Sequence, residues 1–327
     1  MEKYLRCAFA SLRSLREIKR RMSKVKNYLS LIKFSHTIFA MPFALIGFFL
    51  GIFSFKDNFK TPLIPYNFFY EMLSDSKNEL LKLFLLVILC MVFARSAAMA
   101  FNRYLDRQFD AKNPRTAVRE IPSGIITPKN ALIFTIVSCA SFIVTCFFIN
   151  RLCFFLSPVA LAVVLGYSYT KRFTPLCHLI LGLGLSLAPI GAYLAVTGQF
   201  ALLPILFSIA VLFWVSGFDI IYALQDEEFD KSQQLYSIPA WLGKAKALRV
   251  SEFLHLISAS AVIFAGVYGG FGWLFWIGSA IFIGMLIYQH LIVKPTDLKR
   301  VNLAFMTANG IASVVFAIFV IADLFIN

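Results

Sequence analysis

The sequence predicts an all-α, polytopic membrane protein, and three observations carry that prediction. Of the 327 residues, 59% are hydrophobic and only 15% are charged, whereas soluble domains carry about 25% charged residues. Long runs contain no Asp, Glu, Lys or Arg, as a hydrocarbon solvent requires; the longest, residues 173–218, has 46 residues. The basic residues behind the net charge of +14 lie between apolar runs and form no nucleic-acid module. We therefore expect lipid, and no nucleic acid, around this chain.

Residues 1–34 form a basic, weakly amphipathic segment ahead of the first apolar run. They hold ten of the Lys and Arg residues and lack the apolar core of a secretory signal. We expect a cytoplasmic or interfacial segment attracted to anionic lipid, with a mitochondrial transit peptide as the alternative. Residues 35–327 contain no low-complexity linker and no soluble region, so they are predicted to form a single intramembrane domain.

The apolar runs then predict nine spanning helices, each close to the ~20 residues that cross a bilayer. The first four lie near residues 35–55, 83–103, 130–150 and 152–170. The uncharged residues 173–218 suit two spans with a turn near Gly198, and residues 253–293 divide in the same way at Gly269 and Gly270. A run from Val301 to Ala322 completes the count.

The distribution of Lys and Arg predicts the orientation of these spans. Of the 31 basic residues, 25 lie in the N-terminal segment and the even-numbered loops, five lie on the other side, and Arg95 lies inside the second span. Because cytoplasmic loops carry the excess of Lys and Arg, we expect a cytoplasmic N-terminus. Arg95 is expected to pair with an anion or to extend toward the membrane surface.

Two acidic segments lie at the predicted cytoplasmic ends of spans. In the first, Asn102, Asp106 and Asp110 are spaced at i, i+4 and i+8; in the second, Asp219, Asp226 and Asp230 are spaced at i, i+7 and i+11. Each set would share one face of a continuous helix. Hard oxygen ligands suit Mg²⁺, which commonly uses one or two carboxylates together with substrate phosphate oxygens. The pattern therefore predicts two clusters that hold Mg²⁺ and a diphosphate between them.

Basic and tyrosine side chains accompany both segments and are candidate partners of the diphosphate and of a second substrate. The predicted substrate-binding residues are Arg103, Lys112, Arg115, Arg119, Tyr167, Tyr169, Lys171, Arg172 and Tyr222. The six cysteines include no CxxC pair and are interpreted as small hydrophobic residues. The four histidines, His36, His178, His255 and His290, lack metal-ligand spacing and are interpreted as structural, with His36 kept as a candidate near the site.

The first acidic segment, followed by the run from Lys112 to Gly124, resembles the first signature of the UbiA superfamily of intramembrane prenyltransferases. The second is similar to the other signature, with Tyr222 before Asp226 and Asp230 and the run from Tyr236 to Pro239 after them. The resemblance covers essentially the whole chain after Lys33. It implies that the nine helices form a bundle around a central cavity with a cytoplasmic cap, and that residues 35–327 are one prenyltransferase domain.

The resemblance also implies an activity, with closest similarity to the 4-hydroxybenzoate polyprenyltransferase branch. It implies Mg²⁺-dependent transfer of a polyprenyl group from polyprenyl diphosphate to a small aromatic acid in ubiquinone biosynthesis, or to a dihydroxynaphthoate in menaquinone biosynthesis. Its metal ligands would be Asn102, Asp106, Asp110, Asp226 and Asp230. The predicted catalytic residues are Asp106, Asp110, Asp219, Asp226 and Asp230, with Asp219 or Asp230 as acceptor of the aromatic proton.

Other readings stay open at the level of sequence. Intramembrane acids also occur in ion-coupled secondary transporters, although those acids lie near midspan at broken helices. A soluble-type polyprenyl diphosphate synthase is disfavoured because neither segment contains adjacent aspartates. Heme, chlorophyll and homogentisate acceptors are further alternatives within the superfamily.

Overall fold

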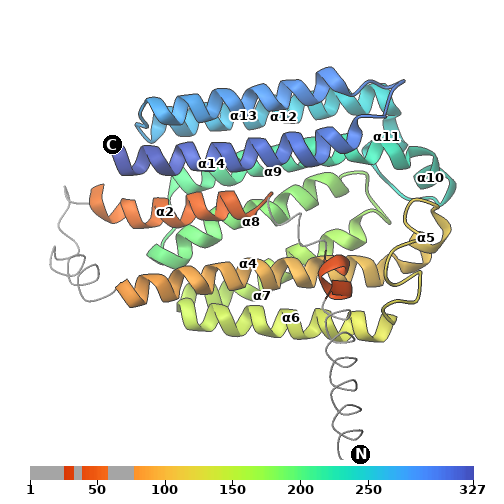
Figure 1. The fold of residues 1–327 in the computed structure, drawn as a ribbon, viewed down its shortest axis with the longest axis horizontal. Coiled ribbons are helices and arrows are strands. Elements are labelled where there is room, and N and C mark those ends of the chain that lie inside the picture. Colours follow the sequence, from red (N-terminus) through yellow and green to blue (C-terminus); the bar gives the residue numbers. More distant parts are fainter. Residues whose placement is uncertain (1–25, 33–38, 58–76) are drawn as a thin grey trace, which may run out of the picture.

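The computed structural model describes residues 26–32, 39–57 and 77–327, and these are almost entirely helical (Figure 1). The predicted N-terminal segment lies mostly outside the described residues, and so does His36. The long helices are α2 (Met41–Asp57), α4 (Lys77–Leu105), α6 (Pro128–Ile149), α7 (Arg151–Thr170), α8 (Cys177–Thr197), α9 (Leu202–Ala223), α12 (Lys244–Tyr268), α13 (Trp273–Ile292) and α14 (Asn309–Ile326). The short helices are α5 (Arg107–Lys112), η3 (Leu224–Asp226), α10 (Glu227–Ser232), α11 (Ile238–Leu242) and the π-helical turn η4 (Leu303–Ala308).

The helices confirm the predicted nine-span architecture. Within the described residues, eight helices are long and apolar enough to cross a membrane, and Met41–Ser54 is a shorter ninth. Both predicted divisions are present: Gly198 ends α8 with φ of 65°, and Gly270 lies between α12 and α13 with φ of 62°. Glycine suits these turns because it reaches positive φ at little cost. The protein is an integral, multi-pass membrane protein.

The long helices pack side by side into one bundle (Figure 1). The most extensive pairings are α9 with α12 and α8, α4 with α6, α2 with α8, and α13 with α14. The core that α2 shares with α9, α13 and α14 is largely aromatic, with Phe43, Phe207, Trp214, Phe282 and Phe316 fully buried. This part of the bundle forms a closely packed wall behind the site.

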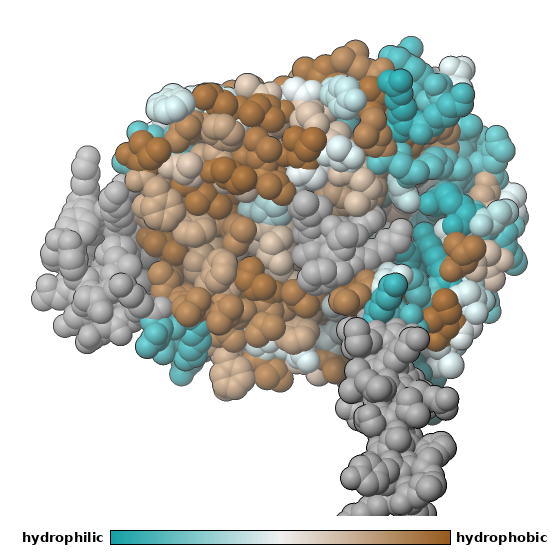
Figure 2. Space-filling model, viewed as in Figure 1, coloured by the Kyte–Doolittle hydropathy of each residue, from teal (hydrophilic) through white to brown (hydrophobic). Residues whose placement is uncertain are grey.

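Polar surface gathers at one end of the bundle, whereas apolar surface covers its middle (Figure 2). The polar end is formed by residues 106–127 and 224–243, which include α5, α10 and α11 and which we call the cap. The C-terminus and the α8–α9 turn lie at the other end (Figure 1). Both acidic segments therefore occupy the same end, as the topology predicted.

The helices do not run continuously through the acidic segments as the face-sharing prediction assumed. Helix α4 ends at Leu105, and Asp106, with φ −86° and ψ 3°, precedes α5. Helix α9 ends at Ala223, and Asp226, with φ −104° and ψ 3°, precedes α10. These dihedrals lie in the bridge region, where turns and many active-site residues are found. Each segment is thus a long helix that bends at an aspartate into a six-residue helix.

Candidate active site

The two aspartates of the first acidic segment each pair with an arginine. Asn102, in the last turn of α4, donates from Nδ2 to Asp106 Oδ2 at 3.0 Å. The other oxygen of Asp106 pairs with Arg172 Nη2 at 2.9 Å. Asp110 pairs through Oδ1 with Arg119 Nη1 at 2.6 Å. Arg172 lies 66 positions from Asp106 along the chain, and Arg119 lies nine positions from Asp110.

The second acidic segment has the same construction. Asp226 accepts from Arg115 Nε at 3.1 Å and from Asn113 Nδ2 at 3.2 Å, and its second oxygen also contacts Arg115. Arg115 in addition donates to the Tyr222 hydroxyl at 2.9 Å. Asp230 is completely buried and lies 2.7 Å from Lys171 Nζ. The loop after the first segment therefore reaches across to Asp226 of the second.

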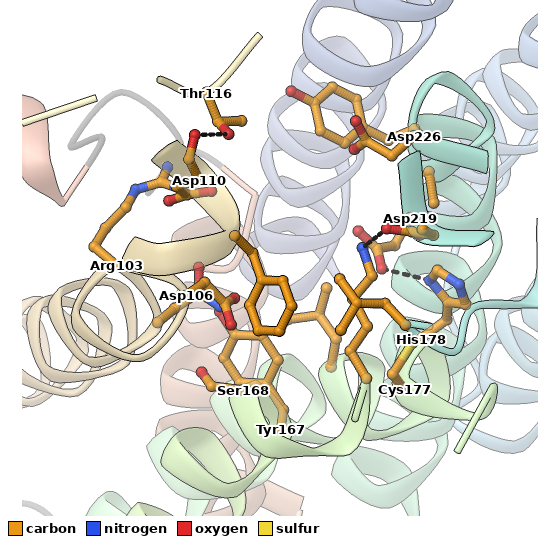
Figure 3. A pocket seen from close by; sticks show the side chains of 18 of the residues that line it. Arg103, Asp106, Asp110, Thr116, Tyr167, Ser168, Cys177, His178, Asp219 and Asp226 are labelled. Carbon is orange, nitrogen blue, oxygen red and sulfur yellow. Dashed lines mark hydrogen bonds and ion pairs between the residues drawn. The ribbon is translucent and has the colours of Figure 1, made fainter. Parts of the chain in front are cut away.

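Asp219 differs from these four carboxylates because its partner is a histidine. His178 Nδ1 lies 2.7 Å from Asp219 Oδ2 (Figure 3). No Lys or Arg in the described ranges forms an ion pair with Asp219, and its side chain is 24% exposed. Asp219 thus keeps an oxygen available to the space between the segments.

That space is a cavity of about 290 Å³ between the two acidic segments, which we call the polar cavity. Figure 3 shows Asp106 and Asp110 on one side of it and Asp219 and Asp226 on the other. The predicted residues that line it are Asn102, Arg103, Asp106, Asp110, Arg115, Arg119, Tyr167, Lys171, Arg172, Asp219, Tyr222, Asp226 and Asp230. The structure therefore brings together residues from six helices, α4, α5, α7, α9, η3 and α10, and from the segments between them.

Two predicted substrate-binding residues lie outside the polar cavity. Lys112 is exposed and contacts Gln233 Oε1 at 3.1 Å, so it links α5 to the end of α10. Tyr169 is also exposed, and its ring packs against Phe101 with 5.8 Å between the ring centroids. Direct contact of these two side chains with a substrate stays a prediction.

Burial and ion pairing set the charge states at the cap. Burial raises the pKa of Asp106, and the opposing charge of Arg172 does not fully offset it. Burial also lowers the pKa of Lys171, but the charge of Asp230 outweighs this and the pKa is raised overall. Lys171 therefore remains cationic, while the Asp106 carboxylate holds a proton more readily than an exposed aspartate.

Two arginines of α4 line the polar cavity without a carboxylate partner among the described residues. Arg95 lies in the interior of the span, and its Nε is buried without a hydrogen-bond partner. Arg103 is 5% exposed and forms no ion pair within 4.0 Å in the described part of the chain. Buried guanidinium groups are costly unless an anion accompanies them. These two side chains therefore favour an anionic ligand in the cavity.

The donor set fits Mg²⁺ together with a phosphate-bearing ligand. Within the described ranges, no three acidic, His or Cys side chains converge as ligands of one ion do. Mg²⁺ does not require such a cage, because it commonly takes one or two carboxylates, waters and substrate phosphates. Asp110 Oδ2 is buried without a hydrogen-bond partner, which leaves a hard oxygen ligand in place. Asn102, Asp106, Asp110, Asp226 and Asp230 are the residues that would hold the ion.

A second, apolar cavity of about 370 Å³ continues from the polar one. The two cavities share Arg95, Met99, Tyr167, Leu181 and Leu185. Along α7 the apolar cavity runs from Tyr167 to Cys153, a length of about 21 Å at the helical rise. Its lining also includes the exposed side chains Val159 and Phe200. The apolar cavity can therefore accommodate an extended hydrocarbon chain.

Sequence reasoning missed three residues of the site. Asn113 contacts Asp226, Ser237 donates to Asp230 Oδ2 at 2.9 Å, and His178 contacts Asp219. Asn113 and Ser237 lie inside the signature runs, and that position could have marked them. His178 precedes Asp219 by 41 residues, and no spacing rule connects two residues on neighbouring helices.

Comparison with known proteins decides the family. The model of the UbiA prenyltransferase family matches residues 63–311. The chain belongs to the UbiA prenyltransferase family. It is 28% identical over 241 residues to the 4-hydroxybenzoate octaprenyltransferase of Nitrosospira multiformis, covering 72% of this chain and 81% of that protein. It is 30% identical over 240 residues to the enzyme of the same name from Nitrosomonas europaea, covering 73% and 81%.

Solved structures of UbiA homologues share the fold of this prenyltransferase. The apo UbiA homologue from Aeropyrum pernix K1 superposes with a TM-score of 0.70 at 28% identity, covering 89% of this chain and 97% of that one. The homologue from Archaeoglobus fulgidus bound to DMAPP and Mg²⁺ gives a TM-score of 0.67 at 21% identity, covering 92% and 100%. The protein is therefore an enzyme, and the family and the placement of its acids at one end of the bundle disfavour the transporter reading.

Proposed function

We propose that this prenyltransferase transfers a polyprenyl group from a polyprenyl diphosphate to 4-hydroxybenzoate, with Mg²⁺, in quinone biosynthesis. The single observation that carries the proposal is the arrangement of two acidic clusters around a cationic cavity that continues into an apolar one. The curated relatives named 4-hydroxybenzoate octaprenyltransferase support the acceptor. The UbiA homologue bound to DMAPP and Mg²⁺ supports the donor and the metal.

The polar cavity is suited to the diphosphate. Mg²⁺, when bound, neutralises charge on the leaving diphosphate and so favours cleavage of the allylic C–O bond. Arg115, Arg119, Lys171 and Arg172 lie within ion-pair distance of the acidic clusters. They can therefore supply charge-assisted hydrogen bonds to the phosphate oxygens. These donors stabilise negative charge as it develops on the leaving group.

The shared boundary of the two cavities is suited to the reacting carbon and the acceptor. We place the prenyl chain in the apolar cavity, which begins at Tyr167 and Leu181. We assign the acceptor carboxylate to Arg95, whose guanidinium lacks an anionic partner among the described residues. An aromatic acid held in this way would face the allylic carbon with its ring.

Asp219 is the better of the two predicted proton acceptors. Asp230 is 0% exposed and is held by both Lys171 and Ser237, whereas Asp219 is accessible from the cavity. In the reaction the C–O bond breaks and its electron pair goes to the diphosphate oxygen. A ring carbon of the acceptor forms the new C–C bond with the allylic carbon. The electron pair of the C–H bond at that ring carbon then returns to the ring and restores its aromaticity. The released proton passes to the Asp219 carboxylate.

The test is product formation by purified protein in lipid nanodiscs. We expect a prenylated product, identified by mass spectrometry, from geranyl diphosphate, Mg²⁺ and 4-hydroxybenzoate. The same assay with dihydroxynaphthoate or homogentisate in place of 4-hydroxybenzoate measures the acceptor preference. Asp106→Asn and Asp226→Asn should each reduce kcat/KM by about 100-fold or more, because loss of a metal-ion ligand removes several kcal/mol of transition-state stabilisation.

Glu228→Gln is the matched control, since Glu228 belongs to the second acidic run but its side chain is 93% exposed. This variant should keep wild-type activity. Wild-type activity in both aspartate variants would contradict the assignment of the acidic clusters. A wild-type protein that prenylates only a naphthoate or homogentisate would replace the proposed acceptor.

A further inference from the structure

His178 joins three separate parts of the chain at the edge of the polar cavity. It lies in the first turn of α8, is 3% exposed, and lines the cavity. Its Nδ1 contacts Asp219 on α9 at 2.7 Å, and its Nε2 lies 3.3 Å from the backbone N of Ile238 on α11. One imidazole thereby connects a spanning helix, a site carboxylate and the cap.

The hydrogen-bond network fixes which nitrogen carries the proton. The backbone N–H of Ile238 can only donate, so His178 Nε2 acts as the acceptor. The ring proton then resides on Nδ1 and is donated to Asp219 Oδ2. Asp219 is the acceptor in that bond and need not be protonated. One of its two oxygens is thus fixed, and the other remains free.

The environment of Asp219 suits a carboxylate that must accept a proton. Asp106, Asp110, Asp226 and Asp230 each have a carboxylate oxygen within ion-pair distance of Arg or Lys, so part of each carboxylate is already engaged. A single imidazole N–H donor orients the Asp219 carboxylate through one of its oxygens and leaves the other without a Lys or Arg partner among the described residues. The Asp219 carboxylate therefore stays oriented and presents a free oxygen to the polar cavity.

We infer that His178 is a positioning residue, which orients Asp219 so that the free carboxylate oxygen accepts the proton released from the aromatic acceptor. The inference rests on the proposed function. The ring C–H bond breaks after the new C–C bond has formed, its electron pair returns to the ring, and the proton moves to Asp219. His178 itself neither gains nor loses a proton.

The experiment compares two substitutions of similar size at position 178. His178→Leu removes the donor, whereas His178→Asn keeps an N–H donor near the place of Nδ1. With geranyl diphosphate and 4-hydroxybenzoate, we expect His178→Leu to lower kcat by about 10-fold or more and to leave KM for the diphosphate nearly unchanged. His178→Asn should recover most of kcat, which a purely structural role would not produce.

A double-mutant cycle shows whether His178 acts through Asp219. In an Asp219→Asn background, His178→Leu should change kcat by less than about twofold, because the group that it orients has already lost its function. Independent, multiplicative losses would overturn the inference. Equal losses in the Leu and Asn variants, or wild-type kcat in the Leu variant, would also overturn it.

His255→Asn serves as a control for loss of a buried histidine. His255 is 3% exposed, contacts Trp214 O at 3.2 Å and lines neither cavity; its substitution should lower the melting temperature and leave the kcat of folded protein unchanged. Absence of any product from the wild-type protein would contradict the proposed function itself. If the wild-type protein is active and His178→Leu leaves kcat unchanged, only the role of His178 is contradicted.

Discussion

Arg95 lies where a charged side chain is least expected, within the apolar span α4. Its guanidinium sits at the boundary of the polar and apolar cavities. An unpaired charge in this position costs several kcal/mol or is offset by a ligand. We interpret that cost as the basis of selectivity for an acidic aromatic acceptor over a neutral one.

Substitution of Arg95 tests this interpretation. Arg95→Met keeps most of the aliphatic stem and removes the charge, so KM for 4-hydroxybenzoate should rise by about 10- to 100-fold, as expected for a lost charge-assisted hydrogen bond. KM for the prenyl diphosphate should stay the same in steady-state assays. The methyl ester of the acceptor should show no comparable penalty.

Arg151→Met provides the matched control, because Arg151 is exposed at the opposite end of the bundle and lines neither cavity. It should leave both KM values unchanged. Equal effects of Arg95→Met on the acid and its methyl ester would show that Arg95 does not bind the carboxylate.

The acidic residues of the site could be predicted from the sequence, whereas several of their partners could not. Asp106, Asp110, Asp226 and Asp230 are spaced regularly and follow spans, so a local pattern reveals them. The contact of Arg172 with Asp106 joins positions 66 residues apart. Such pairings depend on how α4 and α7 pack against each other, and periodicity carries no information about that packing.

At the scale of the element, the spacing of the acidic residues did not predict the bends at Asp106 and Asp226. The sequence favours an uninterrupted helix through each segment. Helical backbone hydrogen bonds are still present in the first segment, from Asp106 N to Asn102 O at 2.9 Å and from Asp110 N to Asp106 O at 2.8 Å. The short helices α5 and α10, which follow these aspartates, lie in the cap (Figure 1). Span boundaries were predicted within a few residues because hydropathy changes sharply there, whereas these bends produce no such change.

The close packing of α2 against α8 at Gly47 can be tested by substitution. A Cβ at this position would lie 2.0 Å from the carbonyl oxygen of Pro189, so α2 and α8 approach through backbone atoms. Gly47→Ala should therefore destabilise the protein by about 1–3 kcal/mol, seen as a lower melting temperature in detergent.

Gly284→Ala is the comparison for helix propensity, since a Cβ there meets nothing within 4 Å. It should be neutral or slightly stabilising. Equal melting temperatures for the two variants would contradict the close approach of α2 to α8.

At the scale of the whole molecule, the distribution of charge predicts which end faces the cytoplasm. The cap carries the site, and the basic residues of the even-numbered loops lie at the same end. We expect this end to be cytoplasmic by the positive-inside rule.

Cysteine labelling in a cysteine-free variant measures that orientation. Val118→Cys, at a cap position that is 78% exposed, should react with a membrane-impermeant maleimide only in inside-out vesicles. Gln199→Cys, in the exposed α8–α9 turn, should react only in right-side-out vesicles. The reverse pattern would invert the proposed topology.

The matching construction of the two acidic segments has a consequence for how the site was assembled. Asp226 and Asp230 follow Asp106 and Asp110 by the same interval of 120 residues, and four spans, α6 to α9, lie between the two bends. An even number of crossings returns the chain to its starting face, so a tandem copy of such a unit inserts in the same direction as the original. An odd number would have placed the second cluster on the far side of the bilayer, where the two could never share one diphosphate.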